Sequence, residues 1–426
     1  MLDTNISLLP KKNKDQKGPL RVLAVGLETR EESSLDEMQR LLSTLGLELV
    51  KKISFALREI NPATYITKGK VEELGQEVKD CLADAVVIDA ELSPNQIKNL
   101  EKALGGHLVL DRPGVIIEIF SKHAKTKEAK TQVELARLNY LLPRLTHFWS
   151  HFERQRGGIG QKGMGEKQLE VDRRLVKKRI SILEERLKSV RKERSIRRSG
   201  RRDFSKVALV GYTNAGKSTL LNALTESKVL AENKLFSTLD SSVKALNPDS
   251  HPPVVAIDTV GFIERLPTTL IASFRSTLEE LEEADFLLHV VDGSSPKAKE
   301  QIEVTESVLK DLKLDGKPRA IVLNKMDLVK TISQLNWARA FAPKAIRVSA
   351  YDKEQVKKLR QTILSHFTEL LEVIDVVIPY SESKLESQIR KVAQVDNQKY
   401  LESGTFYRIR IPTHWIQRLK LDLFKP

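Results

Sequence analysis

The chain has 426 residues, 40% of them hydrophobic, and its 71 Lys and Arg against 57 Asp and Glu give a formal charge of +14. At roughly 100 to 200 residues per domain, this length predicts two to four domains, each large enough to bury a core. The lone cysteine, Cys81, excludes an internal disulfide and favours a reducing, cytoplasmic environment, and neither a signal peptide nor a membrane span is expected.

The positive charge is concentrated in one part of the chain. Residues 151–206 contain 19 Lys and Arg against 8 Asp and Glu, so 11 of the excess charges lie in this segment. Such a segment is either the solvated face of a helix or a surface that binds a polyanion, most plausibly nucleic acid, by releasing its counterions.

The first residues read as a disordered lead-in, residues 1–19, followed by an α/β domain over residues 20–123. Short apolar runs and helical periods alternate in this domain, which predicts a parallel sheet. The expected strands are 21–26, 47–56, 85–90 and 107–111, and the expected helices are 35–45, 70–83 and 96–104. No G-x-G-x-x-G follows the first strand, which argues against a dinucleotide-binding domain.

Residues 124–202 predict an antiparallel helical hairpin. Apolar side chains between Leu169 and Val190 recur at helical spacing, with Lys and Arg on the other faces. Five glycines occur within residues 157–165, between the two helices. This glycine-rich tip is either a flexible connection or a backbone that can approach a phosphate or a crowded RNA surface closely.

A P-loop follows the strand at residues 206–210 and opens a helix, which is the context that this motif requires. Its glycines let backbone N–H groups and the helix N-terminus face phosphates. Lys217 supplies a positive charge to the β and γ groups and Ser218 offers a hydroxyl to Mg²⁺. The nucleotide-binding residues expected here are Gly211, Tyr212, Thr213, Asn214, Ala215, Gly216, Lys217, Ser218 and Thr219.

Two further motifs lie in the order expected after a P-loop. Residues 258–261, which are Asp258, Thr259, Val260 and Gly261, form D-x-x-G after a strand. Asp258 is expected to hold the metal through water and the Gly261 N–H to sense the γ-phosphate. Next come Asn324, Lys325, Met326 and Asp327. The Asp327 carboxylate can accept two hydrogen bonds from guanine, whereas adenine lacks both donors, so GTP is favoured over ATP.

The remaining nucleotide contacts are expected in two loops. Ser349, Ala350 and Tyr351 are expected to close over the guanine. The best candidate for switch I is the run Phe236, Ser237, Thr238, Leu239 and Asp240, in which Thr238 would bind Mg²⁺ and the γ-phosphate; Ser237 in its place, or two ordinary surface hydroxyls, are the alternatives. Lys217, Thr238 and Gly261 are therefore the candidate catalytic residues of a GTPase domain over residues 203–372.

Phe262 stands where many small GTPases place the glutamine that orients the attacking water. A phenyl ring cannot orient water, so slow hydrolysis by the protein alone is expected, with a partner completing the site.

Residues 373–426 predict a small α/β appendage, with strands at 376–380 and 405–411 and helices at 384–392 and 413–423. Its aromatic and arginine side chains either form its core or stack on RNA.

With these motifs, the chain resembles the HflX family of translational GTPases. The segments that resemble the family are residues 61–74, 124–136, 140–145 and 163–174, and the resemblance extends from about residue 20 to 372. Met164 departs from the family, which usually has proline in a Gly-Pro-Gly-Glu turn, and Pro113 stands where threonine is common.

The resemblance implies a monomeric, cytoplasmic GTPase that binds GTP, GDP and Mg²⁺ and associates with the large ribosomal subunit and its rRNA. It also implies GTP hydrolysis stimulated by ribosomes, and the splitting or rescue of stalled ribosomes during stress such as heat. In this chain the rRNA contacts would fall to the basic hairpin, with Arg156, Lys162, Arg173 and Arg174 as candidates.

Two questions stay open at this point. Asn214 resembles the P-loop asparagine of several related GTPases, which resembles a ligand for an activating K⁺. It is therefore either such a ligand or a structural hydrogen-bonding residue. The alternative function is an NTP-driven RNA remodelling factor with a second nucleotide site in the N-terminal domain, and a GTP-regulated binding module is a third reading.

Overall fold

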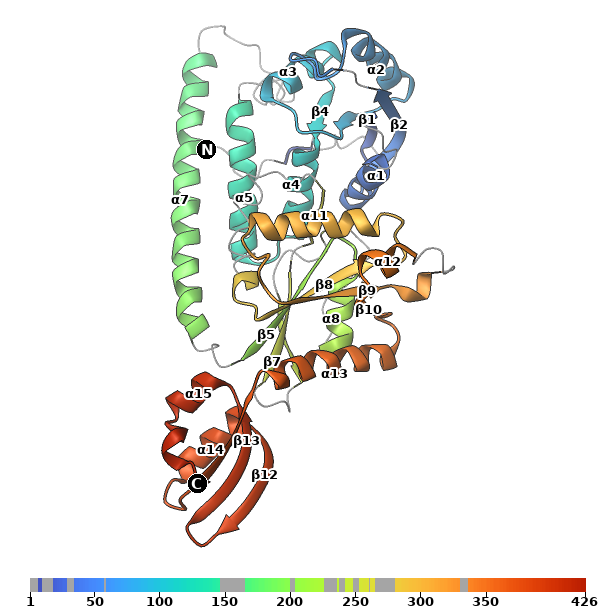
Figure 1. Cartoon of the computed structure of the whole chain (residues 1–426). Helices are drawn as coiled ribbons and strands as arrows, with labels where there is room; N and C mark the ends of the chain where they lie inside the picture. The colour runs from blue at the N-terminus through green and yellow to red at the C-terminus, as the bar shows by residue number, and fades with distance from the viewer. Residues whose placement is uncertain are drawn as a thin grey trace. The chain divides into compact units, whose positions relative to one another are not determined.

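The computed structural model describes residues 7–9, 18–28, 34–56, 59–145, 165–199, 204–225, 236, 242–247, 253–259, 261–264, 280–329 and 336–426. The chain packs as two compact units (Figure 1). Unit 1 contains Met1–Arg191, Asn233–Asp240 and Arg265–Arg275, and unit 2 contains Lys192–Glu232, Ser241–Glu264 and Ser276–Pro426. Within these described ranges, no helix is both long enough and apolar enough to cross a membrane.

Unit 1 is built on a four-stranded parallel sheet in the order β2-β1-β3-β4, which confirms the predicted fold class. Its strands are β1 (Arg21–Glu28), β2 (Glu48–Ala56), β3 (Ala85–Ile88) and β4 (Leu108–Asp111). Helices α2 (Lys68–Asp80) and α3 (Pro94–Ala103) contribute with the strands to one apolar core. Helices α1 (Ser34–Leu45) and α4 (Arg112–His123) pack on each other on the other side of the sheet.

Helix α4 is absent from the elements expected from the sequence. Its first residues, Arg112, Pro113 and Gly114, look like a turn, but they form the first helical turn. Asp111 at the end of β4 caps the helix, because its Oδ1 accepts a hydrogen bond of 2.9 Å from the Gly114 N–H. Proline is favoured in a first turn, where its missing N–H has no intrahelical partner anyway.

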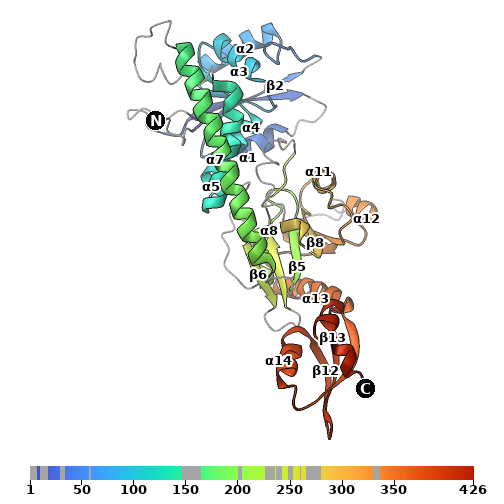
Figure 2. The ribbon, with the colours of Figure 1, turned by 90° about the vertical axis from the view of Figure 1, so that its left-hand side faces the viewer.

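Helix α5 (Lys127–Leu141), the short 3-10 helix η1 (Leu142–Arg144) and the long helix α7 (Gly165–Ser199) form the described part of the predicted hairpin. Figures 1 and 2 show α5 and α7 side by side. An apolar seam joins them through Leu135, Leu138, Leu145, Val176, Leu183 and Leu187. Arg179 adds a two-pronged ion pair with Glu134, at 2.7 and 3.0 Å. The expected tip lies outside the described residues, except for Gly165 at the start of α7.

The expectation of a disordered lead-in is wrong for residues 7–9. Leu8 is 2% exposed, and its backbone N–H donates to Glu118 of α4 at 2.9 Å. The Ser7 hydroxyl donates to the other oxygen of the same carboxylate at 3.1 Å. A single apolar side chain in a polar segment gave no periodic signal, so sequence patterning could not detect this docking.

The first part of unit 2 is a six-stranded sheet in the order β10-β9-β8-β5-β7-β6, parallel except for β6. Its elements in chain order are β5 (Ser205–Val210), α8 (Lys217–Thr225), β6 (Ser242–Asn247), β7 (Val254–Asp258), β8 (Phe286–Asp292), α11 (Ala298–Asp311), β9 (Arg319–Asn324), η2 (Met326–Leu328), α12 (Asn336–Phe341), β10 (Ile346–Arg347) and α13 (Lys353–Glu369). Because β5, β7 and β9 are parallel, their carboxyl ends share one edge of the sheet. The P-loop, D-x-x-G and Asn324-to-Asp327 motifs all follow these ends.

The chain ends in a three-stranded antiparallel sheet, β11-β13-β12, with its own apolar core. Its elements are β11 (Glu372–Ile378), α14 (Ser383–Val392), β12 (Gln394–Leu401), β13 (Gly404–Ile411), α15 (Thr413–Arg418) and the 3-10 helix η4 (Leu421–Phe424). Strand β12 was not expected from the sequence. It is a polar edge strand whose residues are almost all exposed, so it carries no apolar alternation.

A candidate guanine-nucleotide site

The P-loop lies between the end of β5 and the first residue of α8, Lys217. Gly211 and Gly216 have φ values of +144° and +88°, which favour glycine. The surrounding atoms also require glycine at both positions. A Cβ at residue 211 would overlap the Val290 carbonyl of β8, and a Cβ at residue 216 would overlap the side-chain amide of Asn324. The loop is therefore pressed against β8 and the end of β9 with no room for side chains at these two positions.

Lys217 is buried within the loop. Its ammonium group donates to the carbonyl oxygens of Gly211 at 3.0 Å and Tyr212 at 2.9 Å. Burial lowers the pKa of Lys217 to about 8; Asp258 counteracts this shift and Lys325 adds to it. The charged Lys217 side chain is thus buried without a full negative counter-charge, and a bound phosphate would supply one.

Ser218 and Asp258 come together as the metal prediction requires. The Ser218 hydroxyl donates to Asp258 Oδ2 at 2.7 Å, and both residues are buried. A hydroxyl and a carboxylate beside bound phosphates are the hard oxygen ligands that Mg²⁺ prefers, so these residues fit the ion. Thr259 faces elsewhere, because its hydroxyl donates to the Leu209 carbonyl of β5 at 2.6 Å and it is fully buried.

The segment after Gly261 pairs with the P-loop backbone. Phe262 accepts a hydrogen bond from Thr213 N–H at 2.7 Å and donates its own N–H to Gly211 at 3.1 Å. Gly261 lies so close that a Cβ there would be 2.9 Å from the Thr213 Cα. The Phe262 ring is 2% exposed. It packs inside the domain, so it serves as an anchor for this segment and cannot position water.

Asn324 links the P-loop to the loop of Ser349 and Ala350. Its Nδ2 donates to the Ala215 carbonyl at 3.0 Å, and its Oδ1 accepts from the Ala350 N–H at 3.1 Å. With both ends of its amide engaged and 1% exposure, Asn324 organises the loops of the site. The motif alone did not reveal this role, because it depends on two contacts distant in sequence.

The residues around the expected base position are more open. Asp327 is exposed on η2, and Tyr351 is 81% exposed. Lys325 has φ +60° and its ammonium group pairs with Asp292 at 2.8 Å, which fixes the turn between β9 and η2. Met326 is half-buried, and Ser349 accepts from the Tyr351 N–H at 3.3 Å. Asp327 is therefore accessible to a base, while Lys325 holds the loop that presents it.

Several predicted residues lie outside the described part of the chain. They are Ser237, Thr238, Leu239, Asp240, Val260, Arg156 and Lys162. Of the switch I candidate only Phe236 is described, and it belongs to unit 1. Asn214 has φ +61° and is half-buried, and Thr219 lies in the first turn of α8.

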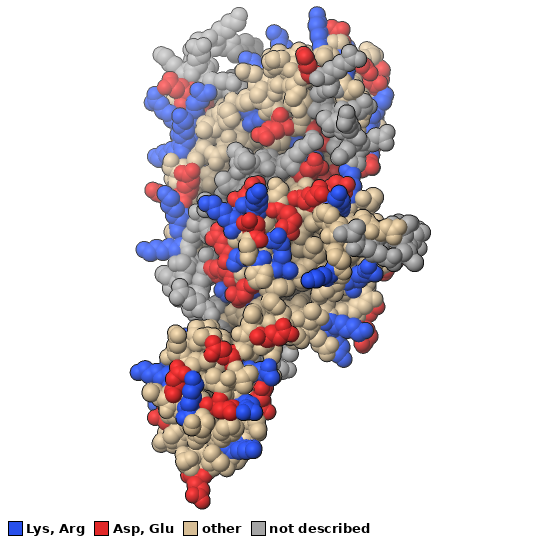
Figure 3. All heavy atoms as spheres, viewed as in Figure 1, with Lys and Arg blue, Asp and Glu red and all other residues tan. Residues whose placement is uncertain are grey.

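The predicted RNA contacts Arg173 and Arg174 are exposed on α7, where Arg174 pairs with Glu170 at 2.8 Å. Other exposed basic residues of this helix are Lys177, Lys178, Arg186, Lys188 and Lys192. Figure 3 shows Lys and Arg side chains gathered along the edge of unit 1 where α7 lies. In the C-terminal part of the chain, Tyr407 of β13 and Trp415 of α15 are buried in one apolar core. These two aromatic side chains are thus not available for stacking on RNA.

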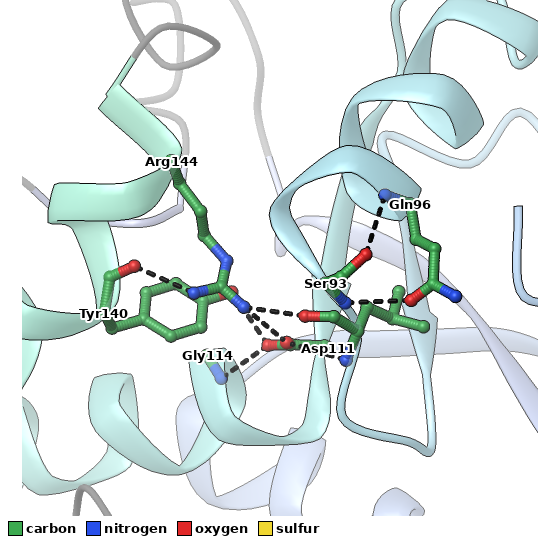
Figure 4. Close-up of polar contacts among 7 residues, drawn as sticks. Ser93, Gln96, Asp111, Gly114, Tyr140 and Arg144 are labelled. Atoms are coloured by element: carbon green, nitrogen blue, oxygen red, sulfur yellow. Dashed lines mark hydrogen bonds and ion pairs between the residues drawn. The ribbon is translucent and has the colours of Figure 1, made fainter. Parts of the chain in front are cut away.

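The carboxyl edge of the unit 1 sheet contains a packed polar network (Figure 4). Asp111 accepts from the Tyr140 hydroxyl at 2.7 Å and pairs with Arg144 at 3.4 Å. Arg144 also donates to the Leu92 carbonyl at 2.8 Å and lies 3.9 Å from the centre of the Tyr140 ring. Asp111 is fully buried and held by protein groups, so the network joins the end of β4 to α5 and η1.

Comparisons with known proteins identify the chain's relatives. Three family models match the chain: GTP-binding GTPase N-terminal at residues 32–121, GTP-binding GTPase Middle Region at 123–201, and 50S ribosome-binding GTPase at 206–325. A solved structure described as SsGBP in complex with GDP is 26% identical, with a TM-score of 0.47, over 82% of this chain and 99% of that one.

Curated relatives match over nearly the whole chain. GTPase HflX of Gluconacetobacter diazotrophicus is 40% identical over 95% of this chain and 98% of its own length. GTPase HflX of Escherichia coli is 36% identical over 90% of this chain and 91% of its own. These matches confirm the predicted GTP hydrolase activity and the resemblance drawn from the motifs. The chain belongs to the HflX family of GTPases.

Proposed function

We propose that this GTPase acts on the large ribosomal subunit, hydrolyses GTP when ribosomes stimulate it, and splits or rescues stalled ribosomes. The observation that carries the proposal is the nucleotide site of residues 206–325, whose matching model is described as a 50S ribosome-binding GTPase. The exposed Lys and Arg of α7 support it, since clustered cations bind the rRNA backbone.

The site residues have the following proposed roles. Lys217 neutralises the β- and γ-phosphates, and the Gly261 N–H senses the γ-phosphate. Ser218, Thr238 and, through water, Asp258 hold Mg²⁺, which neutralises charge on the phosphates when bound. Asp327 reads the guanine. Phe262 cannot orient the attacking water, because its ring is apolar and buried, and we propose that the ribosome supplies this element.

Asn214 is proposed as a ligand of an activating K⁺. It has a left-handed backbone conformation within the P-loop and is partly exposed, so its amide oxygen can face the bound phosphates. A cation at this position would act on the same phosphate oxygens as an arginine finger. Replacing potassium by sodium in the buffer tests the role of K⁺ separately from the role of the ribosome.

The test is steady-state GTP turnover by the full chain with purified large subunits, with small subunits and without ribosomes, each in potassium and in sodium buffer. We expect large subunits to raise turnover by about tenfold or more, as partner completion of GTPase sites does, and potassium to raise it further. Equal turnover with and without large subunits would overturn the ribosomal role. Equal turnover in the two salts would overturn the role of Asn214 alone.

A further inference from the structure

Tyr212 is a P-loop residue whose side chain is buried in the GTPase domain. The pattern G-x-x-x-x-G-K-[ST] leaves this position free, because the phosphate-binding groups are backbone N–H groups, the lysine and the hydroxyl. In this chain the free position holds a tyrosine that is 6% exposed. Its backbone forms an isolated parallel bridge with Phe262, directly after the D-x-x-G motif. Binding of phosphate therefore does not account for a tyrosine at this place.

The Tyr212 hydroxyl contacts the segment that follows D-x-x-G. It accepts a hydrogen bond of 3.0 Å from the backbone N–H of Glu264, a residue 52 positions later in the chain. Two backbone hydrogen bonds, at 2.7 and 3.1 Å, already connect Phe262 to the P-loop. Residues 262–264 are therefore held on the P-loop at both ends, by backbone groups at Phe262 and by the tyrosine at Glu264.

Gly261 immediately precedes this segment and lies beside Lys217. A Cβ at residue 261 would be 3.0 Å from the Lys217 ammonium nitrogen and 2.9 Å from the Thr213 Cα. Lys217 is the side chain that neutralises the β- and γ-phosphates. The contacts that hold residues 262–264 therefore also fix how the Gly261 backbone lies relative to the phosphate-binding lysine.

We propose that Tyr212 is a positioning residue for GTP hydrolysis, whose hydroxyl holds residues 262–264 so that the Gly261 N–H meets the γ-phosphate. GDP has no γ-phosphate, so the contact favours GTP over GDP and does not strengthen nucleotide binding in general. Tyr212 acts through Gly261, because its hydroxyl is engaged by the Glu264 N–H. All of these residues belong to unit 2. The inference rests on the proposed role of Gly261.

Tyr212→Phe in the full chain tests the contact, because it removes the hydroxyl and keeps the ring. Tyr407→Phe is the matched control. The Tyr407 hydroxyl also accepts a hydrogen bond, from Arg390 at 2.8 Å, but it belongs to the separate apolar core of the C-terminal sheet. The readouts are the affinity for GDP, the affinity for a non-hydrolysable GTP analogue, and kcat for GTP at saturation.

We expect Tyr212→Phe to lower the affinity for the analogue and kcat by about threefold to tenfold each, the range that one lost hydrogen bond covers. Its affinity for GDP is expected to stay within about twofold of the unmodified protein, because the P-loop backbone, Lys217 and Ser218 are unchanged. Tyr407→Phe is expected to keep all three values within about twofold.

An unchanged preference for the analogue over GDP in Tyr212→Phe would overturn the inference. Equal losses for the two nucleotides would also overturn it, since the hydroxyl would then only support the P-loop, and so would the same loss of preference in Tyr407→Phe. Gly261→Ala separates this inference from the proposed site. If Gly261→Ala keeps the preference for the analogue, the assigned role of Gly261 fails. If Gly261→Ala loses the preference and Tyr212→Phe keeps it, the role of Tyr212 alone fails.

Discussion

At the scale of single residues, the site combines predictable chemistry with contacts that only the fold reveals. The sequence predicted that Lys217, Ser218 and Asp258 would meet, because parallel strands place their carboxyl ends at one edge. It did not predict that Asn324 would bond to Ala215 and Ala350, or that Phe262 would pair with the P-loop. These contacts join segments far apart in the chain, and no local pattern encodes them.

The buried Lys217 predicts a pH-dependent affinity for nucleotide. Its pKa is lowered to about 8 in the free protein, and phosphates favour its charged form. Above pH 8 the free lysine loses its proton, so nucleotide binding must take a proton up. We expect GDP affinity to be constant below pH 7.5 and to fall by up to about tenfold per pH unit above pH 8.

Calorimetry in two buffers of different ionisation enthalpy measures this uptake. Lys217→Arg is the matched control, because arginine stays protonated over the whole pH range. Any pH dependence that comes from titration of the guanine itself remains in this variant. A decline of the same size in both proteins would show that Lys217 does not titrate as stated.

Asp327 predicts the choice of base. Asp327 is exposed on η2 and is proposed to accept hydrogen bonds from two guanine donors, so Asp327→Asn removes one acceptor and presents a donor instead. We expect GTP affinity to fall by about tenfold to a hundredfold, the cost of an unpaired polar group, and xanthosine triphosphate to bind better than GTP. Competition binding checks this, with ATP as a third ligand. ATP turnover that survives in Asp327→Asn would instead indicate a second nucleotide site.

At the scale of elements, the strands and helices that local apolar periods predicted in unit 1 were found, whereas α4 and β12 were not expected. The four parallel strands of unit 1 and the three helices between them were expected within a few residues of their bounds. Helix α4 was missed because Pro113 and Gly114 resemble a turn, although Asp111 before a proline is a helix-start signal. Strand β12 was missed because it is a polar edge strand whose pairing with β13 depends on tertiary contacts.

The Asp111 network predicts unequal effects of arginine substitutions on stability. Arg144→Ala leaves the fully buried Asp111 without its cation, which costs about 3–5 kcal/mol when a buried pair is broken. Arg174→Ala breaks a pair whose side chains are 77% and 67% exposed, and such pairs contribute about 0–1 kcal/mol. Hydrogen exchange of the α4 amides measures the local free energy of opening. Equal protection of α4 in the two variants would contradict a structural role for the network.

At the scale of the whole molecule, charge and chemistry lie in different parts of the chain. The excess of positive charge noted in the sequence is borne by α7 and its flanking residues, whereas the nucleotide site is assembled from β5, β7, β9 and the loops after them. The family matches extend over both parts. A long basic helix next in sequence to a GTPase domain is consistent with one surface for the ribosome and another for GTP.

The most direct test of ribosome splitting is sedimentation of intact ribosomes after incubation with the full chain and GTP, a non-hydrolysable GTP analogue, or GDP. The account predicts that GTP and the analogue convert intact ribosomes to free subunits, with the protein migrating with the large subunit, and that GDP does not. The Lys217→Ala protein should leave the ribosomes intact under all three conditions. Unchanged subunit ratios with GTP, or protein that remains at the top of the gradient, would contradict the account.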